Sequence, residues 1–250
     1  MAIHKDFPSS PHEILKPEVR WFPADESLRD TSYEKLMPPL VPELRKAVEK
    51  WRVDGYPAIS NTSKTLLNHW FNTPHPIIHA DGTTSNFQYY FAQREAVETI
   101  IYLHEAVKVA DKYDLLRFSK SDAVSAQLFE ETWRRYVVKM ATGSGKTKTM
   151  SLILAWSYFH RKYEERSDLS KNFLVIAPNI IVLDRLRNDF DGLRIFAEDP
   201  VIPSNGVDGK NWKSDFQLTL HIQDKVGPIN PRGNIFLTNI HRVYEAKTKT

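Results

Sequence analysis

The most informative part of the sequence is residues 136–147, which read YVVKMATGSGKT. The apolar run over 136–140 predicts a strand, and residues 146–162 have the apolar spacing of a helix. A glycine-rich turn that joins a strand to a helix and ends in Lys-Thr is the context of a phosphate-binding loop. Met140 stands where the usual pattern has its first glycine, so all fixed positions but one are matched. The stretch predicts nucleotide binding; the alternative is a glycine turn with an incidental lysine.

The residues of this loop are expected to have distinct chemical roles. Gly143 and Gly145 let the backbone curl so that its N–H groups point at the β-phosphate, and the start of the following helix adds a partial positive charge. The Lys146 side chain would reach the β- and γ-phosphate oxygens, and the Thr147 hydroxyl would be a ligand of Mg²⁺. We therefore expect Lys146 and Thr147 to be catalytic residues. The cofactor-binding residues would also include their neighbours Thr142, Ser144 and Lys148.

The chain before the loop is punctuated by proline. Up to about residue 85 it contains ten prolines, which restrict helices to two windows at 42–51 and 63–71. A polar loop is expected over 73–86, with a turn at 80–82. This region therefore predicts short helices and irregular connections.

Strands and helices alternate in the rest of the chain. Besides 136–140, three apolar runs are strand-like, at 173–177, 216–222 and 235–238. Besides 146–162, helices are expected at 93–112, 123–135 and 180–196. Such alternation is typical of βαβ units and a mainly parallel sheet. We therefore expect an α/β domain over residues 86–250, preceded by a mostly helical region over residues 1–85.

The composition is that of an ordinary globular chain, with 41% hydrophobic and 26% charged residues. The absence of cysteine excludes disulfide scaffolds and thiolate metal sites. A formal net charge of +3 is too small to indicate nucleic acid by itself. No apolar run approaches the ~20 residues that a membrane helix needs, and the polar start lacks the apolar core of a secretory signal. We expect a soluble cytoplasmic protein without a membrane partner.

Two stretches together resemble the nucleotide-binding motifs of superfamily-two helicases. Residues 141–147, ATGSGKT, resemble motif I of these proteins. Residues 91–97, FAQREAV, resemble their glutamine motif, in which the amide of Gln93 would read adenine. A carboxamide can donate to one edge atom of adenine and accept from its amino group, so it discriminates against guanine. The resemblance implies ATP as the nucleotide; the alternative for Gln93 is a surface residue on an amphipathic helix.

Two stretches after the loop resemble elements that contact DNA in these motors. Residues 173–179, FLVIAPN, resemble motif Ia. Residues 235–242, IFLTNIHR, resemble the threonine-containing strand end that precedes motif II. The resemblance implies a nucleic-acid interface made by Pro178, Asn179, Arg185, Thr238 and Arg242. A solvated surface charge is an equally good interpretation of Arg185.

The widest match, over roughly residues 40–245, is to the N-terminal part of the Res-like DEAD/DEAH-box helicase subunit of type III restriction enzymes. The chain is similar to that family at residues 51–57, 66–71, 89–95 and 139–143. The resemblance implies an incomplete RecA-like domain that belongs to a motor translocating on double-stranded DNA with ATP and Mg²⁺. It also implies a DNA methyltransferase (Mod-like) subunit as a partner.

One motif of these helicases is missing from residues 1–250. Motif II, Asp-Glu-x-His or Asp-Glu-Ala-Asp, is expected after Thr238, but the only Asp-Glu pair is Asp25-Glu26, far upstream of the loop. A second motor domain with an arginine finger, which contributes about 10³–10⁵ in rate, is also not found. We therefore expect residues 1–250 to bind nucleotide, to hydrolyse it very poorly and not to translocate alone.

Three other functions are considered. A GTPase is suggested by Asp189–Gly192 and by residues 211–215, but the first lies in a helical pattern and the second has one residue too many. A small-molecule kinase would need neither the Gln93 stretch nor the Asn179 loop. A non-catalytic DNA- or protein-binding scaffold, stabilised by its nucleotide, is the strongest alternative.

Overall fold

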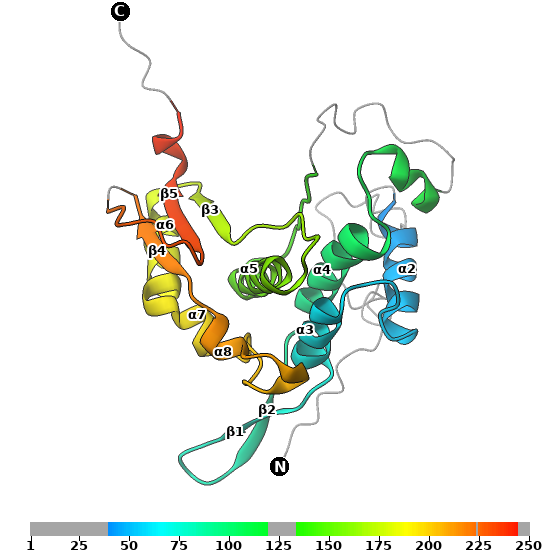
Figure 1. Ribbon diagram of the computed structural model, residues 1–250, viewed down its shortest axis with the longest axis horizontal. Helices are drawn as coiled ribbons and strands as arrows, with labels where there is room; N and C mark the ends of the chain where they lie inside the picture. The colour runs from blue at the N-terminus through cyan, green and yellow to red at the C-terminus, as the bar shows by residue number, and fades with distance from the viewer. Residues whose placement is uncertain (1–39, 120–133, 224, 245–250) are drawn as a thin grey trace, which may run out of the picture. The chain divides into compact units, whose positions relative to one another are not determined.

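The computed structural model describes residues 40–119, 134–223 and 225–244 (Figure 1). The chain divides into two compact units, each discontinuous in sequence. The first consists of residues 1–59 and 89–144, and the second of residues 60–88 and 145–250. The domain boundary expected near residue 85 stays a prediction.

Helices make up most of the described part of the first unit. The helix α2 (Val41–Val53) has Pro42 in its first turn, where proline is tolerated because that N–H needs no partner within the helix. The helix α4 (Phe91–Ile101) continues as a π-helix over Tyr102–Ala106, and a 3₁₀ helix follows at Tyr113–Phe118. The helix predicted over 93–112 is thus confirmed as far as residue 106.

The segment before the phosphate loop is irregular. The strand predicted over 136–140 is wrong, because these residues pair with no strand in the described part of the chain. A strand exists only through hydrogen bonds to a neighbour, and here Val137 is 82% exposed. Of the helix predicted over 123–135, residues 123–133 lie outside the described residues, and residues 134–135 are not helical.

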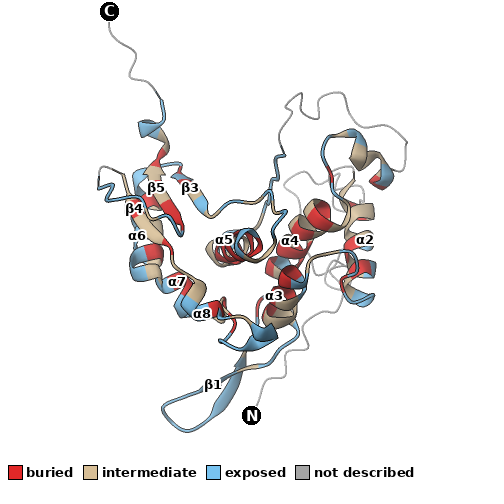
Figure 2. Ribbon diagram, in the orientation of Figure 1, coloured by how far each residue is buried: buried red, intermediate tan, exposed pale blue. Residues whose placement is uncertain are grey.

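Two helices form the interior of the second unit. The helix α3 (Asn61–Phe71) begins after Ser60, whose side chain accepts a hydrogen bond from the Ser63 N–H. The helix α5 (Lys146–Tyr163) packs against α3 and is buried along most of its length (Figure 2). The Trp156 indole N–H donates to the Ser63 hydroxyl at 2.7 Å, so a polar contact joins the two helices inside the core. Both helices agree with the sequence prediction.

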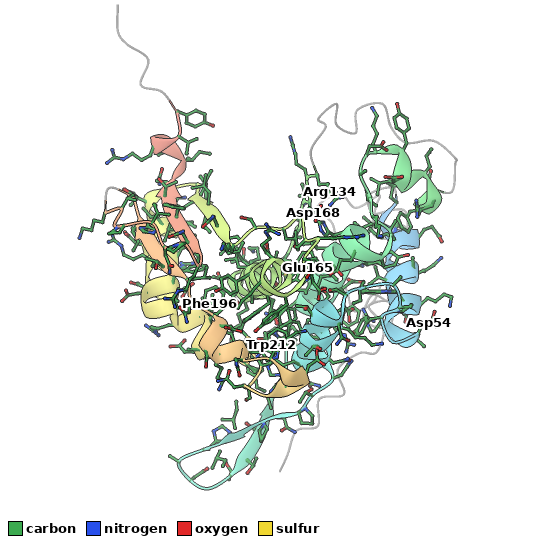
Figure 3. The ribbon with its side chains drawn as sticks, viewed as in Figure 1. Asp54, Arg134, Glu165, Asp168, Phe196 and Trp212 are labelled. Carbon is green, nitrogen blue, oxygen red and sulfur yellow. The ribbon has the colours of Figure 1, made fainter. Side chains whose placement is uncertain are left out.

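Aromatic rings surround the last turns of α5. Phe159 lies 4.8 Å from Trp212, between ring centroids, and Trp212 begins the short helix α8 (Trp212–Asp215) (Figure 3). Tyr163 and Phe216 contact the same ring of Phe159. The strand expected over 216–222 therefore starts late, because Phe216 belongs to this aromatic cluster rather than to the sheet.

The sheet of the second unit has three parallel strands in the order β3-β5-β4. These strands are β3 (Asn172–Ala177), β4 (Thr219–Ile222) and β5 (Asn234–Asn239). Buried side chains of β3 and β5, among them Val175, Ile235 and Leu237, lie on one face, and the helix α6 (Ile180–Phe190) packs against both strands. The expected α/β class with a parallel sheet is confirmed.

Two further segments differ from the sequence prediction. The helix expected over 180–196 is two helices, because Gly192 takes a left-handed φ of 58° after α6 and the chain restarts as α7 (Arg194–Ala197). The polar loop expected over 73–86 is an antiparallel hairpin of β1 (His75–Ile78) and β2 (Thr84–Phe87). The turn predicted at 80–82 is present, and Gly82 has a left-handed φ of 80°.

Candidate functional site

The glycine-rich loop turns sharply into α5. Gly143 and Gly145 have φ values of 81° and 79°, in the left-handed region that side chains disfavour. The Ser144 N–H and hydroxyl both donate to the Ala141 carbonyl oxygen, at 3.3 and 2.7 Å. Gly145 is the N-cap of α5, and its carbonyl accepts from the Thr149 N–H at 3.1 Å. Two left-handed glycines and a serine turn therefore lead into α5, and the binding of phosphate by this loop stays a prediction.

The side chains expected to bind phosphate and metal stand at the start of α5. Lys146 is its first residue and is exposed, and Thr147 follows and is half-buried. The N-terminus of an 18-residue helix presents backbone N–H groups and a partial positive charge, both of which favour an anion. A lysine, a hydroxyl and curled backbone N–H groups are a donor set that fits a nucleotide phosphate with Mg²⁺. The individual roles of Thr142, Ser144, Lys146 and Thr147 stay predictions.

Lys148 has a partner within the second unit. Its ammonium lies 2.7 Å from Asp199 and 5.1 Å from the centroid of the Phe87 ring. The side chain of Asp199 is 11% exposed, so this is a partly buried ion pair. Sequence analysis grouped Lys148 with the nucleotide-binding residues, and that role stays a prediction beside the structural one.

Gln93 contacts the phosphate loop from within the first unit. It is 1% exposed; its amide oxygen accepts from the Tyr90 N–H at 2.9 Å, which caps α4, and its amide nitrogen donates to the Ser144 carbonyl at 3.1 Å. The alternative of a surface glutamine is therefore wrong. Gln93 ties the start of α4 to the backbone of the loop, and its reading of adenine stays a prediction.

A buried charge cluster supports α4 one turn further along. The Glu98 carboxylate is completely buried and accepts hydrogen bonds from Arg52 at 2.7 Å, Tyr56 at 2.6 Å and Arg94 at 2.8 Å. Burial and the neighbouring Glu98 raise the pKa of the Tyr56 hydroxyl, which therefore stays protonated and donates. Sequence analysis missed this cluster, and only the Arg94–Glu98 spacing of four residues hinted at it.

A second ion pair joins α2 to α4. Arg45 lies 2.9 Å from Glu95, a carboxylate whose pKa is raised by its burial and lowered in part by that arginine. Both clusters fix α4, and with it Gln93, against the rest of the first unit.

Most of the residues expected to contact DNA gather at one edge of the sheet. Pro178 and Asn179 follow β3, Thr238 lies near the end of β5, and Arg242 belongs to the 3₁₀ helix that follows β5. Because β3 and β5 are parallel neighbours with Ala177 opposite Asn239, these positions share the carboxyl edge of the sheet. Ligands of open α/β sheets commonly bind there. Arg185 is exposed on α6, farther from the edge.

Two asparagines order the backbone at this edge. The Asn179 side chain accepts from the Val182 N–H at 2.9 Å and so caps α6, while Asn239 accepts from the His241 N–H at 2.9 Å. The Asn239 amide nitrogen is buried and has no hydrogen-bond partner among the described residues. Sequence analysis did not single out Asn239. Contact of any of these residues with nucleic acid stays a prediction.

No group of three or more histidine and acidic side chains within the described residues is arranged to hold a metal ion. Among the same residues, no helix has the length and apolar character needed to cross a membrane.

Comparison with known proteins gave one match. The model of the family described as "Type III restriction enzyme, res subunit" matches residues 86–250. No curated protein and no solved structure matches the chain.

Proposed function

Because this chain belongs to the type III restriction enzyme res subunit family, we propose that it is the ATP- and DNA-binding portion of a helicase-like motor. The membership confirms the family resemblance and the RecA-like α/β fold expected from the sequence. The observation that carries the proposal is the turn at Gly143 and Gly145 that leads into the N-terminus of α5.

The loop and α5 supply the proposed nucleotide site. Lys146 neutralises charge on the β- and γ-phosphates, the backbone N–H groups around Gly143 and Gly145 bind oxygens, and Thr147 is a ligand of Mg²⁺. When bound, Mg²⁺ polarises the phosphate oxygens and stabilises negative charge on them. Gln93, which holds the loop through Ser144, is proposed to read adenine.

The carboxyl edge of the sheet supplies the proposed DNA site. Phosphate contacts position a duplex without reading its sequence, and they need N–H and cationic donors. Asn179 at the start of α6 and Arg242 after β5 offer such donors, and Arg185 on α6 extends them. Double-stranded DNA is therefore the proposed substrate, and a Mod-like DNA methyltransferase is the proposed partner.

Hydrolysis by residues 1–250 alone is proposed to be very slow. After the phosphate loop these residues contain no Asp-Glu pair to hold the metal through a carboxylate and to orient the attacking water. Nucleotide binding is the activity expected of this polypeptide, and translocation is expected of the motor to which it belongs.

A non-catalytic scaffold is the second candidate. It is favoured by Gln93, whose amide oxygen and nitrogen both bond to protein backbone. If Gln93 only holds the loop to α4 and does not read adenine, a bound nucleotide would stabilise the fold without being selected for hydrolysis.

Equilibrium binding of a non-hydrolysable ATP analogue with Mg²⁺ separates these proposals. We expect Lys146→Ala to weaken binding at least about tenfold, because charge-assisted hydrogen bonds contribute about 1.5–3 kcal/mol. Lys64→Ala, on the exposed side of α3, is the matched control and should bind like the parent. Equal affinity of the parent and Lys146→Ala would refute the nucleotide site. DNA binding that is equally tight with and without the analogue would favour the scaffold.

A further inference from the structure

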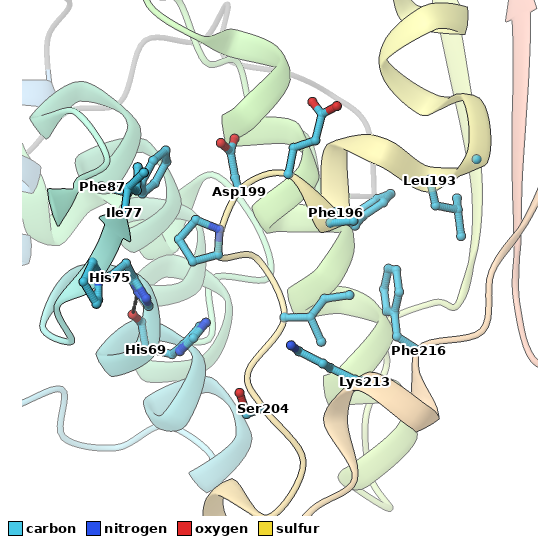
Figure 4. A pocket seen from close by; sticks show the side chains of 16 residues that line it. His69, His75, Ile77, Phe87, Leu193, Phe196, Asp199, Ser204, Lys213 and Phe216 are labelled. Carbon is cyan, nitrogen blue, oxygen red and sulfur yellow. Dashed lines mark hydrogen bonds between the residues drawn. The ribbon is translucent and has the colours of Figure 1, made fainter. Parts of the chain in front are cut away.

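The second unit contains a cavity whose lining includes none of the residues proposed to bind ATP or DNA, although Lys148, expected near the nucleotide, pairs with Asp199 of its wall. Its volume is about 590 Å³, in the range of about 300–1,000 Å³ that is common for ligand sites. Its walls come from the hairpin β1–β2, the end of α3 and the segment 192–216, which carries α7 and α8 (Figure 4). One nucleotide fits within this volume.

Aromatic and aliphatic side chains give the cavity apolar walls. Phe87 comes from β2, Phe196 from α7, and Phe216 follows α8. The rings of Phe196 and Phe216 lie 4.9 Å apart, between centroids, with their planes tilted by 54°. Ile77 of the hairpin adds an exposed apolar side chain to the wall. Phe196 is buried against Phe216, so the half-buried rings of Phe87 and Phe216 are the ones left to contact a ligand. Exposed aromatic rings are where proteins stack nucleobases without regard to sequence.

His69 brings an unsatisfied polar atom to this wall. Its Nε2 is buried and has no hydrogen-bond partner among the described residues. Burial and the nearby ring of His75 lower the pKa of His69 to about 4, so the imidazole is neutral at neutral pH. The Nε2 atom of His75 donates to the His69 carbonyl oxygen at 2.7 Å, which fixes the hairpin against α3. A nitrogen without accessible surface offers no direct contact to a ligand, and the backbone of Pro200 interacts with this imidazole, so His69 shapes the cavity wall.

The charges at the cavity favour an anion. Both of its carboxylates already have cations, since Glu198 lies 2.7 Å from Arg194 and Asp199 lies 2.7 Å from Lys148. Lys213 is exposed and forms no ion pair within residues 40–119, 134–223 and 225–244. Figure 4 shows Lys213 beside His69 at the cavity. One cation is thus left to attract a negatively charged group next to the apolar walls.

We propose that this cavity binds one nucleotide unit, with its base among the phenylalanine rings and its phosphate at Lys213. The proposal rests on the proposed function, since a DNA motor meets strands from which a nucleotide can be extruded. A free nucleoside monophosphate and one residue of a DNA strand offer the same chemistry. The single cation distinguishes this cavity from the loop at Lys146, which is suited to a triphosphate.

Calorimetric titration of the full chain tests this proposal with two probes, thymidine 5′-monophosphate and a five-residue oligothymidylate. Thymine is chosen because Gln93 is expected to read adenine. We expect Lys213→Gln to weaken binding about three- to fivefold, because an exposed charge pair contributes little. Ala197→Trp, at an exposed position of α7 that lines the cavity, should reduce affinity by about tenfold or more. Lys64→Gln makes the same charge change on α3 outside the cavity and should leave affinity unchanged.

The outcomes are distinct from those of the ATP test. Binding of the oligonucleotide alone would assign the cavity to a DNA strand, and binding of the monophosphate alone would assign it to free nucleotide; both support the proposal. Absence of binding by either probe would overturn it, as would undiminished binding by Ala197→Trp and Lys213→Gln together. Should Ala197→Trp fail to fold, Lys213→Gln against Lys64→Gln decides. An ATP analogue titrated into the same samples should bind Lys213→Gln and Ala197→Trp like the parent, so the two sites can fail independently.

Discussion

Replacing Glu98 by alanine should strongly destabilise the first unit. Its carboxylate is completely buried and is the common acceptor for Arg52, Tyr56 and Arg94, with distances of 2.6 to 2.8 Å. Without it, the Arg52 and Arg94 guanidinium groups lose their common anion, and Arg52 keeps its interaction with Glu95. The helix α4 then loses one of its two charged connections to α2, and the Arg45–Glu95 pair remains.

The expected loss follows from the burial of the partners. Removing one member of a buried ion pair costs about 3–5 kcal/mol, because the remaining charge is left without a partner. The Arg52 and Arg94 side chains are 14% and 23% exposed, so water can reach them in part. We therefore expect a loss at the lower end, about 3 kcal/mol, for Glu98→Ala. Glu98→Gln keeps one acceptor and the shape, and should lose roughly half as much.

Hydrogen exchange of the α4 amides measures this loss in the first unit. Asp54→Ala is the matched control, because Asp54 pairs with Lys50 on the exposed side of α2 (Figure 3). Such surface pairs contribute about 0–1 kcal/mol. A loss below about 1 kcal/mol for Glu98→Ala, or one equal to that of Asp54→Ala, would refute the reasoning.

Three further predictions concern single side chains. Because the folded pKa of His69 is about 4, below its ordinary 6.5, the folded state binds fewer protons between these values, and stability should fall by up to about 3 kcal/mol as the pH drops from 6.5 to 4. Urea unfolding at several pH values checks this, and His69→Gln should flatten the profile. The Cβ added by Gly143→Ala meets no neighbouring atom, so the substitution costs only the strain of a left-handed φ, about 1–2 kcal/mol. Gly143→Ala should weaken ATP-analogue binding in calorimetry. Gly82→Ala, which is equally strained in the hairpin turn, should leave that binding unchanged. Lys148→Met should lower thermal stability by about 1 kcal/mol because Asp199 loses its cation; an unchanged melting temperature would contradict this.

Sequence patterns predicted the elements that are fixed by local chemistry. The strands β3 and β5, the helices α3 and α5 and the turn at Gly82 follow from apolar spacing, caps and glycine, all of which act within a few residues. The loop at Gly143 and Gly145 is of the same kind, since its conformation depends on the glycines themselves. These were therefore accessible to sequence analysis.

Elements that depend on partners far away in the sequence could not be predicted from local patterns. The apolar run 136–140 satisfies every local rule for a strand, yet it pairs with no strand among the described residues. The hairpin β1–β2 lies in a stretch whose mostly polar residues predict a loop, whereas its pairing is made by backbone groups. Glu98 bonds to Tyr56, which lies 42 positions earlier, and to Arg52, which lies 46 positions earlier. No local pattern along the chain indicates contacts at such separations.

Backbone N–H groups around Lys146 are proposed to bind the phosphates of an adenine nucleotide. The NMR chemical shifts of these amides, followed as an ATP analogue and Mg²⁺ are added, test this binding most directly. The amide signals from Gly143 to Thr147 should move most, and in Lys146→Ala they should move only at ligand concentrations about tenfold higher or more. Saturable binding that leaves these five signals in place would contradict the account.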